Sequence, residues 1–183
     1  MVGYFASAEK ISKGVFGLLN PIREALYPRL SSLARHASED AARLARIGAM
    51  VMVAGGFALG AGLFVFAPLL VRILMGPGFA PAITVLRILA ALPLMLSVTD
   101  SVGLQWLLPL GRDGDVNRII LTAGALNLAL AVLLAPHFAD VGMAWAIVCA
   151  EAFVCYSMVR VVLRSTSLFR NPIFPATLPE WTR

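Results

Sequence analysis

Side chains that could bind an anion lie on one face of the N-terminal segment, residues 3–28. When this segment is stepped at about 100° per residue, the angle of an α-helix, they fall within a sector about 100° wide, and most apolar side chains fall outside it. The residues of this polar face are Glu9, Lys13, Asn20, Arg23, Glu24 and Tyr27. Glu9 and Lys13 have the i, i+4 spacing of a helical ion pair.

Lys13 and Arg23 are the cations of this face, and their spacing suits an elongated anionic ligand. Ten residues of helix separate them by about 15 Å, which matches a pyrophosphate with an attached sugar. The alternative is an internal ion-pair network with Glu9 and Glu24 that only allows the helix to enter a bilayer.

An ionisable side chain near the bilayer centre costs roughly 2.5–3.5 kcal/mol, so this polar face cannot meet hydrocarbon. We expect the helix to line a watery cavity between neighbouring helices. Two alternatives stay open: an amphipathic helix lying flat on a membrane surface, and a helix of a soluble protein.

The whole composition indicates a membrane protein. Of the 183 residues, 60% are hydrophobic and 14% are charged, and the mean hydropathy is +0.85. Long uncharged runs reach the length of about 20 residues that crosses a hydrocarbon core. We predict an all-α integral membrane bundle of five transmembrane helices, at about 3–28, 47–75, 79–110, 119–136 and 143–163.

Two acids interrupt the predicted spans, Asp100 in the third and Glu151 in the fifth. Each could bind a coupling ion or balance the charge of the cationic helix; the alternative is a buried acid with a satisfied partner. Ser97, Ser101 and Gln105 form a polar line beside Asp100 at four-residue spacing.

Backbone signals divide the spans. Gly76-Pro77-Gly78 is expected to end the second span, and Pro93 is expected to bend the third. Gly56 and Gly60 form a GxxxG pair, the spacing that allows helices to approach closely in lipid.

Enzymatic and nucleic-acid functions find no support in the sequence. The net charge is +5, but the cations gather in short connections beside apolar spans, not on one soluble face. Cys149 and Cys155 are six residues apart on one predicted helix and point in different directions. No catalytic serine, zinc or P-loop motif is present. We expect no enzyme, no metal, no other cofactor and no nucleic-acid partner.

Lysine and arginine in the short connections predict the orientation. The first and third connections and the C-terminal end are rich in them, so we expect a cytoplasmic C-terminus, with residues 167–183 as an irregular cytoplasmic tail. The N-terminus would then point outward, which suggests that a further span precedes it.

Four stretches carry a resemblance to a known family. They are VGYFASAEKISKGVFGLLNPIREALYPRLS, GPGFAPAITVLRILA, GLQWLLPLGRDGDVNR and APHFADVGMAWAIVCAE. Over about residues 2–165, in collinear order, the chain resembles the C-terminal lobe of Wzx-type oligosaccharide flippases, which belong to the multidrug/oligosaccharidyl-lipid/polysaccharide superfamily.

The resemblance implies two six-helix lobes around a central cavity. By alternating access they would move undecaprenyl-pyrophosphate-linked sugar units across the bacterial inner membrane for O-antigen or exopolysaccharide synthesis. Residues 1–166 would be a partial C-terminal lobe with the last five of twelve helices. Its partners would be the bilayer, the lipid-linked sugar and a missing N-terminal lobe, and a fragment without that lobe is not expected to transport alone.

The resemblance implies that Lys13 and Arg23 hold the anionic head of the lipid, and it implies no role for Asp100. From the polar residues themselves we expect substrate binding by Lys13, Arg23, Asn20 and Tyr27. We expect charge balancing or ion coupling by Glu9, Glu24, Asp100 and Glu151. Two alternatives stay open: a drug/cation antiporter of the same superfamily, in which the acids would matter more, and a truncated membrane fragment that does not transport.

Overall fold

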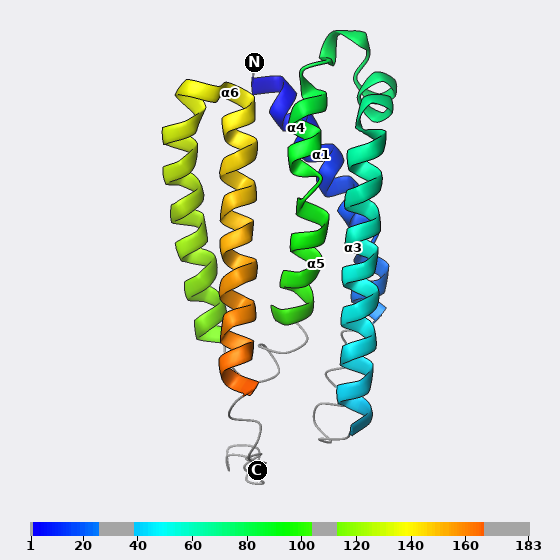
Figure 1. Ribbon diagram of the computed structural model, residues 1–183, viewed down its shortest axis with the longest axis vertical. Coiled ribbons are helices and arrows are strands. Elements are labelled where there is room, and N and C mark those ends of the chain that lie inside the picture. Colours follow the sequence, from blue (N-terminus) through cyan, green and yellow to red (C-terminus); the bar gives the residue numbers. More distant parts are fainter. Residues whose placement is uncertain (1, 26–38, 104–112, 167–183) are drawn as a thin grey trace, which may run out of the picture.

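The computed structural model describes residues 2–25, 39–103 and 113–166, which form helices and turns with no strand among them. This confirms the all-α prediction for the described part of the chain. Figure 1 shows the longer helices aligned along one axis as a bundle. The elements are α1 (Val2–Gly17), α3 (Glu39–Leu74), the 3₁₀ helix η1 (Pro77–Phe79), α4 (Ala82–Leu89), α5 (Leu92–Val102) and α6 (Asp113–Thr166).

The predicted helix at 3–28 is not continuous. Its first part, α1, ends at Gly17, and a turn at residues 18–19 precedes a second helical stretch at residues 20–25. Pro21 accounts for the interruption, because proline has no N–H to donate to the carbonyl of Gly17 and its ring clashes with that carbonyl. The remainder of the predicted span, residues 26–28, lies outside the described residues.

Three segments of the described chain are long and apolar enough to cross a membrane: Arg46–Leu74, Ala82–Val102 and Gly114–Arg164. The second and third predicted spans correspond to the first two of these. The count of five is not confirmed. The helix α1 has 16 residues and is not among the three, and the predicted spans 119–136 and 143–163 both lie within the third segment. The predicted tail, 167–183, lies outside the described residues.

The helix α6 folds back on itself. A straight helix of its length would far exceed the roughly 30 Å of a hydrocarbon core, but Ala139 has φ 46° and ψ −123° and breaks it. Figure 1 shows two arms of α6 side by side. At the reversal a Cβ on Gly142 would lie 2.5 Å from the carbonyl oxygen of Leu134, so glycine is needed for this close approach.

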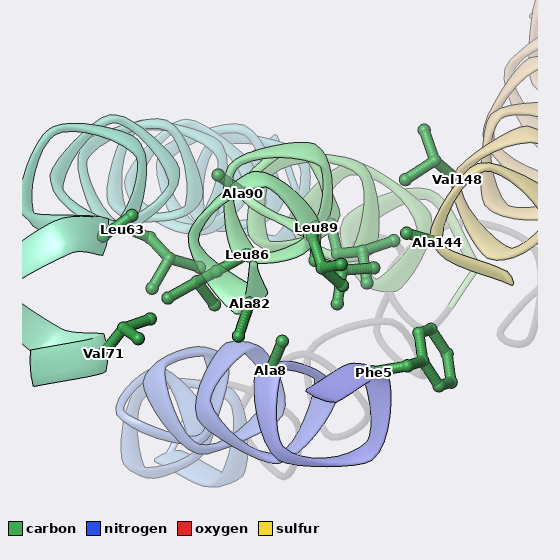
Figure 2. Close-up of a cluster of buried hydrophobic side chains, with 13 residues drawn as sticks. Phe5, Ala8, Leu63, Val71, Ala82, Leu86, Leu89, Ala90, Ala144 and Val148 are labelled. Atoms are coloured by element: carbon green, nitrogen blue, oxygen red, sulfur yellow. The ribbon is translucent and has the colours of Figure 1, made fainter. Parts of the chain in front are cut away.

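The main core lies where α1, α3, α4 and α6 meet (Figure 2). Ala8, Ala82 and Ala144 are all fully buried, one each from α1, α4 and α6. Leu86 and Leu89 fill the space between these helices. The helix α1 is therefore packed into the bundle, which favours a bundle helix over one lying apart on a membrane surface.

The Ala82–Val102 segment is broken between α4 and α5, as Pro93 predicts. Proline lacks the N–H that would bond the carbonyl of Leu89, four residues earlier. The Oγ of Ser12 on α1 donates a hydrogen bond of 3.1 Å to this carbonyl instead. On the other side lies the GxxxG pair of α3, where a Cβ on Gly60 would be 2.6 Å from the carbonyl oxygen of Ala90.

The Ser12 hydrogen bond predicts a small stability effect. Ser12→Ala should lower the free energy of unfolding by about 0.6 kcal/mol and by no more than about 1.7 kcal/mol, the range for hydrogen bonds between membrane helices. Unfolding in mixed detergent micelles by titration with sodium dodecyl sulfate measures the change. Ser7→Ala on the same helix is the control, and equal losses in both variants would contradict the role of this bond.

Candidate functional site

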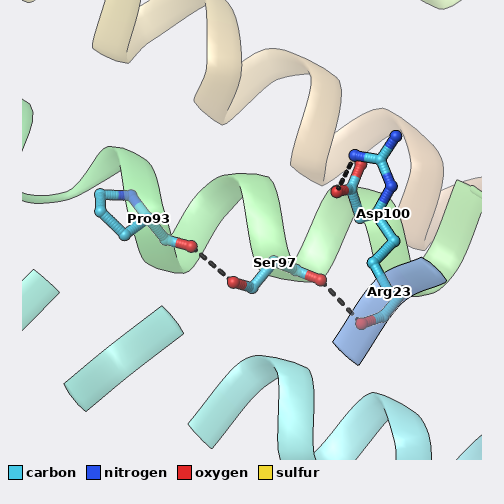
Figure 3. A network of polar contacts seen from close by, with 5 residues as sticks. Arg23, Pro93, Ser97 and Asp100 are labelled. Carbon is cyan, nitrogen blue, oxygen red and sulfur yellow. Dashed lines mark hydrogen bonds and ion pairs between the residues drawn. The ribbon is translucent and has the colours of Figure 1, made fainter. Parts of the chain in front are cut away.

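An ion pair joins the helical stretch at 20–25 to α5. The Nη1 of Arg23 lies 3.0 Å from the Oδ2 of Asp100, a residue 77 positions further along the chain (Figure 3). The Asp100 side chain is 21% exposed and that of Arg23 is 45% exposed. The pair is therefore partly open, and a ligand could reach the guanidinium.

A second ion pair lies within α1. The Nζ of Lys13 is 2.6 Å from the Oε1 of Glu9, which confirms the pairing expected from their spacing. The Lys13 side chain is 66% exposed. Exposed helical pairs of this kind are worth about 0.3–0.5 kcal/mol, so a stronger anion could displace Glu9.

Glu151 comes from the second arm of α6 and lies within electrostatic reach of both Asp100 and Lys13. We call Glu9, Lys13, Arg23, Asp100 and Glu151 together the charged junction, since they bring α1, the 20–25 stretch, α5 and α6 into one polar region. The junction has two cations and three acids and so carries one net negative charge when all five are ionised. An incoming anion must compete with these acids.

Two other predicted site residues, Asn20 and Glu24, do not join this network in the described structure. Asn20 and Glu24 are exposed, and neither makes an ion pair or side-chain hydrogen bond with another described residue. The acid that pairs with Arg23 is Asp100, not Glu24. Tyr27 lies outside the described residues.

The polar line beside Asp100 has a structural role. Ser97 donates a hydrogen bond of 2.6 Å to the carbonyl of Pro93, and Ser101 donates one of 2.7 Å to the carbonyl of Ser97. Both serines are buried, and a Cβ on Gly56 of α3 would clash with the Ser97 hydroxyl. Both hydroxyls are satisfied by carbonyls of α5, and Figure 3 shows Ser97 apart from the Asp100 carboxylate. Gln105 lies outside the described residues.

The described side chains offer little to a metal ion. No group of three or more His, Cys, Asp or Glu within residues 2–25, 39–103 and 113–166 is arranged to hold one. Cys149 and Cys155 are both free thiols. The side chains of the charged junction can themselves bind anions, cations or protons.

Two curated proteins are similar to most of this chain. An Escherichia coli (strain K12) protein named "Putative O-antigen transporter" is 32% identical over 163 residues, which cover 88% of this chain and 39% of that protein. A Shigella dysenteriae protein of the same name is 28% identical over 162 residues, 88% of this chain and 40% of that protein. No protein-family model and no solved structure matches the chain.

The chain thus spans about two fifths of the length of these relatives. Their names describe transporters and not enzymes, and three segments here are able to cross a bilayer, so the chain is a multi-pass membrane protein. The similarity confirms the resemblance to Wzx-type flippases carried by its sequence: the chain is related to part of the O-antigen transporters.

Proposed function

We propose that this chain is part of a transporter that moves undecaprenyl-pyrophosphate-linked sugar units across the inner membrane for surface polysaccharide synthesis. The charged junction would bind the anionic head of the lipid. The observation that carries this proposal is the partly open ion pair between Arg23 and Asp100, and the exposed Lys13 supplies a second cation. The transport of O-antigen named for the relatives supports the same substrate class.

The two cations would share the work of binding a pyrophosphate. The planar guanidinium of Arg23 can donate two parallel hydrogen bonds to phosphate oxygens. Lys13 would act as a point charge further along the head. Both cations are paired with carboxylates in the structure, so the phosphate would exchange places with Glu9 and Asp100.

This exchange would couple the substrate to a small ion. When the phosphate binds Arg23 in place of Asp100, the Asp100 carboxylate loses its cationic partner. Glu151 remains within electrostatic reach of Asp100. Two carboxylates in a low-dielectric site repel each other, and a proton or Na⁺ taken from the medium would relieve that repulsion. We therefore assign Asp100 and Glu151 to ion coupling.

Transport would need more than this chain. Alternating access requires one lobe to move against another, and the chain covers about two fifths of each relative. We propose that a second, N-terminal lobe completes the cavity. The names of the relatives do not favour the drug/cation antiporter as an alternative.

Binding can be tested on the chain itself. The purified chain in uncharged detergent should retain radiolabelled undecaprenyl pyrophosphate in a saturable manner, and unlabelled undecaprenol, which lacks phosphate, should not compete. Lys13→Ala should weaken binding about 3–10-fold, as expected for loss of one exposed charge contact of about 1 kcal/mol. Lys10→Ala, an exposed lysine on the same helix, is the matched control.

A transport assay completes this test. In a chimera, the chain replaces the matching segment of the Escherichia coli relative, and export of surface polysaccharide is measured. Competition by undecaprenol as strong as that by undecaprenyl pyrophosphate would rule out recognition of the head. Equal losses in Lys13→Ala and Lys10→Ala would remove Lys13 from the site.

A further inference from the structure

A third cation, Arg87, lies on α4, a helix that contributes no residue to the charged junction. The Cζ of Arg87 is 5.4 Å from the centroid of the Phe64 ring on α3. Arg87 is exposed and makes no ion pair or hydrogen bond with any residue that the structure describes. It differs in this from Lys13 and Arg23, which both have carboxylate partners.

Arg87 lies five residues after Ala82, where the Ala82–Val102 segment begins, or about 7.5 Å along the axis. Its guanidinium is stacked over Phe64 of α3, within the membrane-crossing part of the bundle. A cation at this depth without a counter-charge is unfavourable in hydrocarbon. It must meet an anion that comes from outside the described chain, and its long side chain can extend toward the near interface to do so.

The position of Arg87 on α4 separates it from the substrate head. Ala82 of the same helix lies above Ala8 of α1 (Figure 2), and the Leu89 carbonyl accepts the Ser12 hydrogen bond. Arg87 follows Ala82 by five residues, which turns its side chain about 140° away from that side. An anion at Arg87 is therefore distinct from one held at the charged junction.

An exposed aromatic surface continues from Arg87 toward the middle of the bundle. Phe64 is 53% exposed and Phe57 is 63% exposed. Their seven-residue spacing places them on one face of α3, about 10 Å apart along the axis, with Phe57 further from the Leu74 end. A headgroup at Arg87 would thus leave an acyl chain free to run along Phe64 and Phe57, away from the Leu74 end of α3.

We propose that Arg87 and the Phe64–Phe57 face bind one anionic phospholipid of the surrounding bilayer. The phosphodiester accepts hydrogen bonds from the guanidinium, and an acyl chain packs on the two rings. An anionic lipid is favoured over a zwitterionic one, because Arg87 needs a net negative counter-charge and a choline headgroup brings its own cation.

Native mass spectrometry of the full chain, in uncharged detergent with added phosphatidylglycerol, tests this proposal. The wild type should retain one tightly bound phosphatidylglycerol, and Arg87→Ala should weaken its binding at least about tenfold. Phe64→Leu, which keeps apolar volume but removes the ring, should weaken it less. Arg118→Ala is the matched control, since Arg118 is also exposed and also lies five residues into its helix. The helical circular dichroism signal checks that each variant is folded. Arg87→Gln is a second variant that removes the charge and keeps a polar side chain, and it should also weaken the binding of phosphatidylglycerol.

Three results would overturn the proposal. The first is equal retention of phosphatidylglycerol by wild type and both Arg87 variants, and the second is an equal loss in Arg118→Ala. The third is that Arg87→Ala loses binding of undecaprenyl pyrophosphate but keeps binding of phosphatidylglycerol. That result would make Arg87 part of the substrate site. Retention of phosphatidylcholine as tight as that of phosphatidylglycerol would contradict the choice of an anionic headgroup.

Discussion

Arg23→Ala is expected to weaken binding of undecaprenyl pyrophosphate about 10–100-fold, whereas Asp100→Asn is expected to strengthen it. A hydrogen bond to a charged group is worth about 1.5–3 kcal/mol, and each 1.4 kcal/mol changes the affinity tenfold. Arg23→Ala removes that bond to the phosphate. Asp100→Asn removes the carboxylate that competes for Arg23, which lies 3.0 Å away from it. Retention of the radiolabelled lipid by each purified variant measures both effects.

The opposite signs distinguish a binding cation from a structural one. If the pair only holds the 20–25 stretch against α5, both substitutions should lower stability and neither should improve binding. Because the Arg23 side chain is 45% exposed, the stability loss from either change should stay near the value of about 1 kcal/mol for partly exposed pairs. Weaker binding in Asp100→Asn would therefore indicate a structural pair.

An exchange of the two charges provides the control. Arg23→Asp combined with Asp100→Arg keeps a cation and a carboxylate in contact but moves the cation to α5. This double variant should recover stability in detergent titrations without recovering lipid binding. Binding by Arg23→Ala that equals the wild type would remove Arg23 from the site.

The features that the sequence predicts correctly depend on neighbours along the chain. The Glu9–Lys13 pair follows from i, i+4 spacing, and the end of α3 just before Gly76 follows from the Gly-Pro-Gly run. The break before Pro93 follows from the missing N–H. Each of these depends on one helix or one turn, so the tertiary arrangement cannot change it.

Contacts between distant segments could not be predicted in this way. Helical periodicity shows that Arg23 belongs to a polar face, but it cannot show that Asp100, 77 residues away, is the partner. One signal was present: Asp100 is the only charge between Arg87 and Arg112, so this lone acid needed a cation from another helix. Ser97 and Ser101 have the same spacing whether their hydroxyls bind a ligand or the carbonyls of their own helix. Only the packing of α5 against α3 determines which partner the hydroxyls have.

The interruption of the first predicted span is not visible in the pattern of apolar residues, because they continue beyond Pro21. The fold-back in α6 occurs at Ala139, within the connection between the predicted spans 119–136 and 143–163, so the position of the reversal agrees with the prediction. The positive φ of Ala139 is uncommon for a residue other than glycine, and no local pattern predicts which residue adopts it. The close approach of Gly142 to the Leu134 carbonyl becomes visible only when the two arms are placed together.

The packing of α3 against the α4–α5 break leads to the largest expected stability effect, in Gly56→Ala. An added Cβ would lie 2.6 Å from the carbonyl oxygen of Pro93 and would clash with the Ser97 hydroxyl. Overpacking of this kind typically costs about 1–3 kcal/mol, because the helices must separate. Titration with sodium dodecyl sulfate in mixed micelles, followed by circular dichroism, should show a lower free energy of unfolding.

A second substitution identifies which atom causes the clash. Ser97→Ala removes the hydroxyl that meets the new methyl group, so the double variant Gly56→Ala/Ser97→Ala should lose less stability than the sum of the single variants. The rescue should be partial, since the Pro93 carbonyl oxygen and the Cβ of residue 97 both remain 2.6 Å from the added Cβ. Gly60→Ala should show no such rescue, because its Cβ would meet the Ala90 carbonyl and no side chain.

Gly62→Ala on the same helix separates packing from helix propensity. A Cβ at Gly62 meets nothing within 4 Å, and alanine is favoured over glycine in a helix by about 0.8–1.0 kcal/mol. Gly62→Ala should therefore leave stability unchanged or raise it, whereas Gly56→Ala and Gly60→Ala should lower it although they gain the same propensity. A change of stability in the same direction in all three variants would contradict this account. The glycines would then act through the flexibility of α3. The carbonyls of Ala90 and Pro93 would not set the distance between α3 and the α4–α5 break.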